Sequence, residues 1–431
     1  MKENNEPIEV SIIGGGFSGL YLAILLKMKG ITCEIFTSGT GASQFWVGTV
    51  DFLDYRQNRD LERSFKEFQK EVPHHPYSFF PFSKIERSFT YFFSQFPDFK
   101  MFTENEKLIN RPVLTSLGNL KPCIGIWHSI FHEFQYLTKE STVILVDFSE
   151  FFNDVMYLVA KNLHDTFACS YRILNLSFKT IFDLIGENGD EISIKDKLSE
   201  YRIASFFDTH SSMATISILG NYIKKEIIKQ FPKLDMKHVD FILFPPILGL
   251  KTEKKIIEEL SKLLNLKCKE LVALSPSLIS KRFDSELNEK IKSLDIPLHK
   301  NYTFIDFNKD ANSKMWWKLK FMNKKGDLCN IHSKCVVFAV GTLFQEGPFA
   351  NVEDFKEIFN KNLLSIPISK ISPSYELTFH NGQGSNIFVA GSALFSFIES
   401  ITEEDEIKYG TGLGLSILTS TQIAEELNRL K

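Results

Sequence analysis

The sequence is poor in cysteine: its six cysteines stand far apart, and no two form a C-x-x-C pair. This spacing argues against a zinc site or an iron–sulfur cluster held by this chain alone, so we expect no metal. It also argues against a secreted disulfide framework. Cys329 and Cys335, with His332 between them, fit the approach to a strand better than a ligand set. The other cysteines are Cys33, Cys123, Cys169 and Cys268.

Long apolar runs and an excess of positive charge are also missing. No apolar run approaches the roughly 20 residues that span a bilayer. The polar start MKENNEPIE leads straight into a short strand and does not resemble a signal peptide. Lys and Arg number 50 against 53 Asp and Glu, which gives a net charge of −3 without a basic stripe. We therefore expect a cytoplasmic protein that does not bind nucleic acid.

The composition is otherwise that of a globular protein, with 43% hydrophobic and 24% charged residues. Phenylalanine is abundant, at 41 residues, and we interpret aromatic stripes as core unless a motif indicates otherwise. A chain of 431 residues exceeds what one hydrophobic core comfortably fills. Two structural regions are therefore expected.

The clearest local pattern is a βαβ unit at the start of the chain. Residues 8–13 predict a buried strand, 17–29 a helix closed by Gly30, and 31–36 the next strand. Further strands are predicted at 142–147, 239–244, 270–274, 335–340 and 387–390, with a hairpin over 315–338 that turns near 323–327. Further helices are predicted at 60–72, 149–163, 251–264 and 413–430. Residues 73–122 show little clean periodicity.

Strand–helix alternation at both ends of the chain predicts an α/β fold with one doubly wound parallel sheet, of the Rossmann-like FAD/NAD(P)-binding type. We expect residues 1–72 and 330–431 to build this flavin-binding domain together. Residues 73–329 would then form an inserted second α/β domain for substrate or partner. The polar stretch 185–196 is expected to be a loop tip.

The sequence Gly14-Gly15-Gly16-Phe17-Ser18-Gly19 fits the dinucleotide-binding pattern G-x-G-x-x-G. It follows a predicted strand and opens a predicted helix, which is the context that the pattern requires. Gly14 permits the tight turn, Gly16 lets the backbone approach a phosphate, and Gly19 lets the helix pack on the strand. The helix start offers free N–H groups and a partial positive charge to that phosphate.

One expected feature of a dinucleotide site is missing. The second strand of such a unit usually ends in Asp or Glu, which holds the ribose hydroxyls of an adenosine. Here the strand ends at Thr37, followed by Ser38, and Glu34 lies mid-strand. A hydroxyl lacks the charge of a carboxylate and its ability to accept hydrogen bonds through two oxygens. Three alternatives stay open: a dinucleotide held by other contacts, a mononucleotide such as FMN, or loss of binding.

A second glycine cluster lies near the end of the chain. A predicted strand ends at Gly391 and Ser392, and the final predicted helix starts in the run Gly410, Gly412 and Gly414. In many flavoproteins such a strand end meets the ribityl phosphate and such a helix start faces the flavin ring. Gly48, Thr49 and Gly341 are further candidate cofactor contacts.

Several segments in order along the chain resemble the B subunit of anaerobic glycerol-3-phosphate dehydrogenase. The resemblance begins in SIIGGGFSGLYLAILLKMKGITCEIFTSGTGASQFWVGTVDFL and covers most of the chain apart from about 150–235. Its later segments are HPYSFF at 75–80, TSLGNL at 115–120, FPPILGL at 244–250, LSPSLISKRF at 274–283, FAVGTLFQEG at 338–347 and NIFVAGS at 386–392.

The resemblance implies a flavoprotein subunit, with FMN or FAD, of a three-part complex in anaerobic respiration. Such complexes oxidise sn-glycerol 3-phosphate to dihydroxyacetone phosphate and pass electrons to membrane quinone. An FAD-bearing catalytic subunit and an iron–sulfur subunit that anchors the assembly to the membrane are the implied partners. Thr37 resembles the family, which fits its usual FMN assignment. The implied location is cytoplasmic, at the inner face of the membrane through a partner.

The chain departs from this family in three places. Its C-terminal glycine run is less rich, residues 397–408 form an acidic insert, and Trp46-Val47 stand where small polar residues are usual. Arg282 matches a family arginine and is a candidate anion or flavin contact, against the alternative of a surface ion pair. His75 is a candidate proton carrier, against a structural role. No residue is identified as the general base that alcohol oxidation needs.

Two other functions compete with the subunit interpretation. The chain is either a stand-alone flavin oxidoreductase on another small substrate or an assembly subunit that kept the fold and lost the cofactor. Thr37, Ser392 and the acidic insert favour the second of these. A nicotinamide dehydrogenase fits least, because the C-terminal glycine cluster has no role there.

Overall fold

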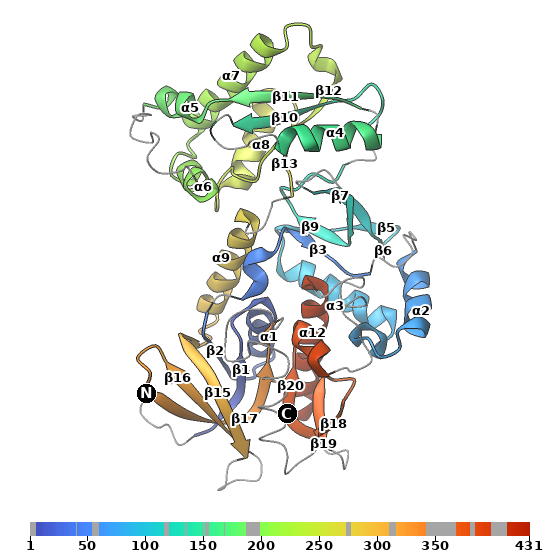
Figure 1. Ribbon diagram of the computed structural model, residues 1–431, viewed down its shortest axis with the longest axis vertical. Coiled ribbons are helices and arrows are strands. Elements are labelled where there is room, and N and C mark those ends of the chain that lie inside the picture. Colours follow the sequence, from blue (N-terminus) through green and yellow to red (C-terminus); the bar gives the residue numbers. More distant parts are fainter. Residues whose placement is uncertain are drawn as a thin grey trace.

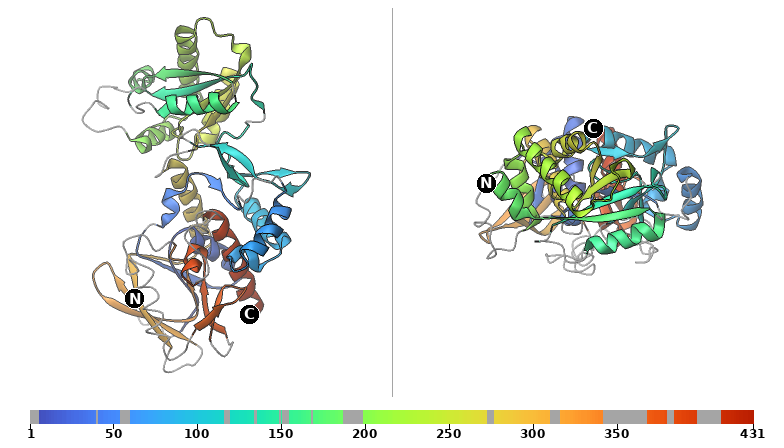
Figure 2. Two further views of the ribbon diagram at one scale, coloured as in Figure 1. Left: turned by 45° about the vertical axis from the view of Figure 1, so that its right-hand side comes forward. Right: turned by 90° about the horizontal axis from the view of Figure 1, so that it is seen from above.

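The structure, a computed structural model, describes most of the 431 residues. The described ranges are 6–39, 41–53, 60–115, 120–133, 136–148, 150, 155–167, 169–186, 199–272, 277–309, 316–341, 368–379, 384–397 and 412–431. The molecule is elongated, with one sheet at each end and smaller strand pairs between them (Figures 1 and 2). The predicted loop tip at 185–196 and the acidic insert lie almost entirely outside the described residues.

The larger sheet, called here the main sheet, has nine strands among the described residues. Its parallel centre runs in the order β14-β2-β1-β17-β20, so strands from both ends of the chain lie side by side. These strands are β1 (Ile8–Ile13), β2 (Cys33–Thr37), β14 (Leu298–Lys300), β17 (Leu328–Phe338) and β20 (Gly384–Val389). This arrangement confirms the predicted doubly wound, Rossmann-like α/β fold.

Antiparallel strands extend the main sheet at two places. The predicted hairpin is confirmed as β16 (Trp317–Asn323) and β17, and β15 (Tyr302–Lys309) pairs with β16. At the other edge β19 (Glu376–Phe379) and β18 (Ile368–Ile371) follow β20. Alternate side chains of a strand face opposite sides, so His332 of β17 faces away from Cys329 and Cys335.

Helix α1 (Phe17–Met28) is buried along almost its whole length because it packs against helices as well as the sheet. Its neighbours are α12 (Leu413–Leu430) and α9 (Leu278–Ser293). Helix α3 (Phe82–Gln95) packs against α12 on its other side, and α2 (Leu61–Glu71) packs against α3 (Figure 1). Helix α3 was not predicted, although its buried Ile85, Phe89 and Phe92 have helical spacing.

The smaller sheet, called here the second sheet, is parallel throughout its described strands, in the order β11-β10-β12-β13. On β10, Val143 and Leu145 face one hydrophobic cluster while Ile144 and Val146 face another. Both faces are therefore buried, as in other parallel sheets covered by helices. Its elements are β10 (Thr142–Phe148), α4 (Val155–Phe167), β11 (Ser170–Leu176), α5 (Phe178–Leu184), α6 (Glu200–Thr209), α7 (Met213–Gln230), β12 (Val239–Phe244), α8 (Glu253–Leu264) and β13 (Lys267–Glu270).

Short antiparallel strands join the two sheets. They are β3 (Thr49–Val50), β4 (Phe99–Met101), β5 (Thr103–Glu104), β6 (Lys107–Leu108), β7 (Arg111–Leu114), β8 (Leu120–Cys123) and β9 (Gly125–Trp127). The described residues also form short 3-10 turns: η1 (Ala42–Phe45), η2 (Pro76–Phe79), η4 (Met236–His238) and η5 (Gly391–Phe397). Rings of Phe92, Phe96, Phe99, Trp127 and Phe283 pack together in this central zone, which places the aromatic stripes in the core as predicted.

Some predicted boundaries differ from the structure. The strand expected at 270–274 lies instead at Lys267–Glu270, because this edge strand alternates an exposed and a half-buried lysine with buried Cys268 and Glu270. Strands β14, β15 and β16 and helix α9 belong to the main-sheet region, although they lie within the range 73–329 that was expected to form the inserted domain. In the part of the chain that the structure describes, no helix is long and apolar enough to cross a bilayer.

Candidate functional site

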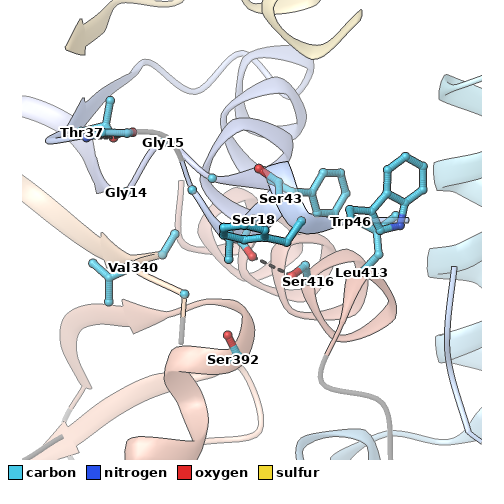
Figure 3. Close-up of a pocket in the computed structure, with 18 of the residues that line it drawn as sticks. Gly14, Gly15, Ser18, Thr37, Ser43, Trp46, Val340, Ser392, Leu413 and Ser416 are labelled. Carbon is cyan, nitrogen blue, oxygen red and sulfur yellow. Dashed lines mark hydrogen bonds between the residues drawn. The ribbon is translucent and has the colours of Figure 1, made fainter. Parts of the chain in front are cut away.

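A cavity of about 660 Å³ lies at the carboxyl ends of the parallel strands of the main sheet. The ends of β1, β2 and β17 meet there with the N-termini of α1 and α12. Figure 3 shows Gly15 and Thr37 at one end of this cavity and Trp46 and Leu413 at the other. The carboxyl edge of a doubly wound sheet is where such folds bind ligands.

Most of the predicted cofactor contacts line this cavity. They are Gly14, Gly15, Gly16, Phe17, Ser18, Thr37, Ser38, Thr49, Gly341, Ser392 and Gly412. Four further predicted glycines do not line the cavity, and a side chain at any of them would collide with a neighbouring backbone or side-chain atom: Gly19, Gly48, Gly391 and Gly414. Gly410 lies outside the described residues. The structure thus brings the two glycine clusters of the sequence together at one site.

The turn after β1 needs glycine at its first position. Gly14 has φ +121°, and a side chain there would collide with the backbone carbonyl of Ala339. Its N–H donates to the Phe36 carbonyl at 2.9 Å, which fixes the turn between β1 and β2. Gly19, one turn into α1, lies directly against the Gly14 carbonyl. Helix α1 therefore starts as close to the end of β1 as the backbone allows.

The start of α1 presents backbone donors to the cavity. Among the described residues, the N–H groups of Gly15, Gly16, Phe17 and Ser18 have no hydrogen-bond acceptor. The N-cap is Gly16, with no side-chain cap, and the first turn carries no acidic residue. Free amides at an uncapped helix start attract an anion such as a phosphate.

The tip of β2 does not offer a ribose-binding carboxylate. The Thr37 hydroxyl donates to the Gly39 carbonyl at 2.7 Å and accepts from the Gly39 N–H at 3.3 Å. Thr37 therefore closes its own turn. Glu34 is held elsewhere, with its carboxylate 2.6 Å from Nε2 of His299. Neither contact places a carboxylate at the tip of β2, and which nucleotide binds here stays a prediction.

The second glycine cluster joins the site through α12. Ser18 of α1 donates to Ser416 of α12 at 2.8 Å, so the two helix starts are tied together at the cavity wall (Figure 3). Ser392, after β20, lies below them in the same view. The Gly391 N–H donates to Thr419 of α12 at 2.9 Å, which anchors the end of β20.

The end of the cavity beside Trp46 carries its only described carboxylate and ammonium, Asp51 and Lys121. Lys121 Nζ lies 2.8 Å from Asp51 Oδ2 and 3.0 Å from Thr49 Oγ1, and Thr49 donates to Asp51 Oδ1 at 2.9 Å. The Trp46 indole N–H donates to the Thr49 carbonyl at 2.6 Å. Trp46, a departure from the family, is therefore fixed as part of the wall, where it contacts Phe99 and Phe283.

Sequence reasoning did not single out Lys121 or Ser416. Lys121 lies in the poorly periodic stretch before residue 122, and its contact with Asp51 spans 70 residues. Ser416 lies two residues after a glycine of the second cluster. Its position near the start of a predicted helix was the only local signal.

Arg282 is neither a cavity residue nor a surface residue. Its side chain is 1% exposed, and it forms a two-pronged ion pair with Glu270 at 2.6 and 3.0 Å. Its Nε donates to the Gly249 carbonyl at 2.8 Å. Burial opposes its charge, but the Glu270 carboxylate together with those of Glu253 and Asp208 outweighs burial and raises the pKa of Arg282. Because these donors already have buried acceptors, the contacts do not support an anion or flavin role.

His75 is also placed away from the cavity lining. It is fully buried, and its ring packs between Phe68, Tyr77 and Phe395. Its Nδ1 accepts the Tyr77 N–H at 3.1 Å and caps the turn at residues 76–79. These contacts favour the structural interpretation of His75 over a proton carrier.

The sequence comparisons agree with the resemblance seen in the motifs. No protein-family model matches the chain. The B subunit of anaerobic glycerol-3-phosphate dehydrogenase from Aliivibrio fischeri is 23% identical over 369 residues, which cover 80% of this chain and 75% of that protein. The B subunits from Glaesserella parasuis and Haemophilus influenzae are 22% and 21% identical, each covering 97% of this chain and 99% of the relative. The resemblance is thus confirmed along nearly the whole chain.

Solved structures give weaker likenesses. A flavoprotein/dehydrogenase from Cytophaga hutchinsonii gives a TM-score of 0.26 at 8% identity; the match covers 85% of this chain but only 43% of that one. The cadaverine monooxygenase DfoA from Erwinia amylovora, solved bound to FAD, gives a TM-score of 0.20 at 13% identity, with 98% and 95% of the two chains covered. Scores this low carry no argument for this chain.

Proposed function

We propose that this chain is a flavoprotein subunit of a quinone-linked, anaerobic glycerol-3-phosphate dehydrogenase complex, in which it relays electrons through a bound flavin. The observation that carries the proposal is the row of free amides at Gly15–Ser18, which opens into the cavity formed by both ends of the chain. The relatives named as the B subunit of that enzyme support the choice of complex.

The residues of the cavity fit a flavin. The uncapped start of α1 would hold the phosphate. Trp46, Val47 and Leu413 supply an apolar wall at the other end, where a ring would lie. A volume of about 660 Å³ is within the range of roughly 300–1,000 Å³ that small-molecule and cofactor sites occupy.

We propose FMN as the flavin, with FAD as the alternative. FMN ends at its phosphate, so it needs no contact beyond the glycine turn. FAD adds an adenosine whose ribose would meet the tip of β2, where the Thr37 hydroxyl is engaged with Gly39. A site that lacks the usual carboxylate there gives the adenosine little to bind.

The flavin would supply the capacity to accept and return two electrons. The chain would hold the phosphate through the α1 amides, exclude water with Trp46 and Leu413, and orient the ring against α12. Oxidation of an alcohol also needs a base for the hydroxyl proton. In the described cavity lining the sole carboxylate, Asp51, is already paired with Lys121. We therefore assign substrate oxidation to a partner subunit and electron relay to this chain.

The proposed assembly has three parts. An FAD-bearing catalytic subunit would oxidise sn-glycerol 3-phosphate to dihydroxyacetone phosphate. An iron–sulfur subunit would anchor the complex at the inner face of the membrane and pass electrons towards quinone. The six cysteines of this chain are all free, and the proposal places the clusters in the iron–sulfur partner.

Reconstitution of the purified chain tests this function. After incubation with FMN or FAD and gel filtration, we expect a retained visible flavin spectrum, with FMN released on heating and identified by mass. Addition of sn-glycerol 3-phosphate to the chain alone should leave that spectrum unchanged. Bleaching by glycerol 3-phosphate or another small substrate would instead identify a stand-alone oxidoreductase. A colourless chain that takes up neither flavin would identify an assembly subunit without cofactor.

A further inference from the structure

The cavity contains a hydrogen-bonded group of three side chains to which the proposed function assigns no role: Lys121, Asp51 and Thr49. They come from three separate places, β8, the segment after β3, and β3 itself. Each pair in the group is in hydrogen-bond contact, at 2.8, 2.9 and 3.0 Å. Thr49 is fully buried, while the side chains of Asp51 and Lys121 are 25% and 35% exposed. A buried hydroxyl therefore anchors a charged pair that reaches the cavity.

Lys121 and Asp51 lie at the end of the cavity away from the free N–H groups of Gly15–Ser18. Thr49 receives the indole N–H of Trp46, which Figure 3 shows opposite Thr37 and Gly15. A side-chain carbon added at Gly412, the N-cap of α12, would lie 3.5 Å from Asp51 Oδ2. A flavin whose phosphate lies at α1 would thus direct its ring towards Lys121 and Asp51.

Both members of the pair keep hydrogen-bonding capacity. An ammonium has three N–H donors, and those of Lys121 meet two acceptors, Thr49 and Asp51, among the described residues. A carboxylate has about four acceptor positions, and Asp51 receives two donors. The site therefore still offers one strong donor and one strong acceptor side by side.

The charge balance decides which ligand group this pair suits. Lys121 and Asp51 sum to zero formal charge, so a phosphate dianion would be repelled by Asp51 about as much as it is attracted by Lys121. The pyrimidine edge of a flavin carries carbonyl acceptors on both sides of an N–H donor. A neighbouring ammonium and carboxylate match that alternation without a net charge.

We infer that Lys121 and Asp51 bind the pyrimidine edge of the flavin ring, with Lys121 as the cation that offsets the negative charge of the reduced ring. This inference rests on the proposed function. It assigns the two residues opposite effects on the flavin potential. The ammonium stabilises the reduced, anionic ring, and the carboxylate weakens that stabilisation.

The test uses the full chain loaded with FMN. Lys121→Met should weaken binding of reduced FMN about tenfold more than binding of oxidised FMN, which corresponds to a two-electron potential about 30 mV lower. Asp51→Asn should shift the potential in the opposite direction, because it removes the negative charge and keeps an acceptor oxygen. Lys121→Arg should restore most of the wild-type potential. The readouts are redox-dye titration and the affinity of the flavin for sulfite, which a nearby cation increases.

Lys84→Met provides the matched control. Lys84 forms an ion pair with Glu425 at 3.4 Å, is 30% exposed, and does not line this cavity. Its loss should leave the potential and the sulfite affinity unchanged.

The possible failures are distinguishable. If the wild-type chain takes up no flavin, the proposed function itself fails. If FMN binds but Lys121→Met and Asp51→Asn shift its potential in the same direction or not at all, only the role assigned to this pair fails. If inorganic phosphate or glycerol 3-phosphate binds the loaded wild type and Lys121→Met abolishes that binding at unchanged potential, the pair is a phosphate site and the inference is overturned.

Discussion

The carboxyl ends of the parallel strands have opposite surroundings in the two sheets of this protein. In the main sheet the strand ends open on a cavity. The backbone N–H groups that face it have no acceptor among the described residues. In the second sheet β13 ends at Glu270, and the Arg282 guanidinium closes that end with a buried ion pair. The same carboxylate accepts the Leu248 N–H at 3.1 Å in the segment after β12.

The difference shows that topology alone does not identify a ligand site. Both sheets place strand ends where α/β folds commonly bind ligands. Among the described residues, the main sheet leaves backbone donors available at its strand ends, because glycines remove side chains at the turn. At the second sheet, Glu270 at the end of β13 is paired with Arg282 of α9, so this strand end serves packing between the two regions. Substitutions in both regions test this contrast.

The closed end of the second sheet should depend on both members of its ion pair. Arg282→Met leaves the Glu270 carboxylate buried without a cation, which should lower the free energy of unfolding by about 3–5 kcal/mol. Urea denaturation measures this loss. The double variant Arg282→Met/Glu270→Met should be clearly more stable than the single variant. Arg429→Met, which removes an exposed pair with Glu426, should cost under about 1 kcal/mol. A small loss for Arg282→Met would contradict the contrast.

The segment between the two sheets should be acid-sensitive through His132. Its Nδ1 lies 3.1 Å from the Ile130 carbonyl and its Nε2 2.8 Å from Lys100 Nζ, so the ring is neutral and accepts from the lysine. Burial, together with the Lys100 and Lys269 cations, lowers the pKa of His132 to about 4 from 6.5. Below pH 6.5 the unfolded chain binds the proton first, so this contribution to stability is lost as the pH falls towards about 4.

The loss attributable to His132 should reach up to about 3 kcal/mol across that interval. His132→Gln keeps a neutral polar side chain and should show a flatter dependence. Urea denaturation of both proteins at several pH values between 4 and 6.5 compares them. Parallel curves would rule out His132 as the titrating group.

Flavin binding at the main sheet should be sensitive to a bulky side chain beside the free N–H groups at the start of α1. Gly16 has φ −80° and ψ −178°, which other residues adopt without strain, and an added carbon there has ordinary contacts. Gly16→Val should therefore leave stability within about 0.5 kcal/mol of wild type. It should nevertheless lower FMN affinity at least about tenfold, or 1.4 kcal/mol, by blocking the amides.

Gly39→Val is the control for this prediction. An added carbon at Gly39 meets nothing within 4 Å, although the residue lines the same cavity. FMN titration followed by fluorescence should give near wild-type affinity for Gly39→Val. Equal affinities for both variants would mean that the α1 amides do not bind the phosphate.

The smallest effect is expected at the tie between the two helix starts. Ser416→Ala removes the acceptor of the Ser18 hydroxyl at a half-buried position. The expected loss of stability is about 1 kcal/mol, the usual worth of one such hydrogen bond. Thermal unfolding with and without FMN measures it. A loss near 3 kcal/mol would show that the cavity wall is held mainly by this contact.

The sequence predicted those helices and strands whose ends are set by neighbouring residues along the chain. The bounds of β1 and α12 agree with the sequence to the residue, and β12 ends at Phe244 because two prolines follow. Helix α3 was missed because the exposed aromatic Tyr91 stands among the buried Phe89, Phe92 and Phe93 and hides the helical period. Strand β13 was displaced because its lysines alternate with buried residues at a sheet edge.

In the candidate site, too, some features could be predicted from nearby residues and others could not. The glycine turn at Gly14 and the deficit at Thr37 followed from spacing along the chain. The partner of Arg282 did not, because Glu270 approaches it only through packing between the two regions. Nor did the contact between Lys121 and Asp51, which joins residues 70 positions apart. Sequence spacing identified the glycine-rich end of the cavity, whereas the contacts at its other end depend on the tertiary structure.

The discontinuous origin of the main sheet has a consequence for biosynthesis. Helix α1 emerges early from the ribosome, but Ser416 and the rest of α12 that complete the wall are translated some 400 residues later. During that interval the buried face of α1 lacks its partner helix and is a natural target for chaperones. Capture of the proposed flavin would therefore follow translation of α12, and a chain interrupted before Leu413 would lack part of the cavity wall.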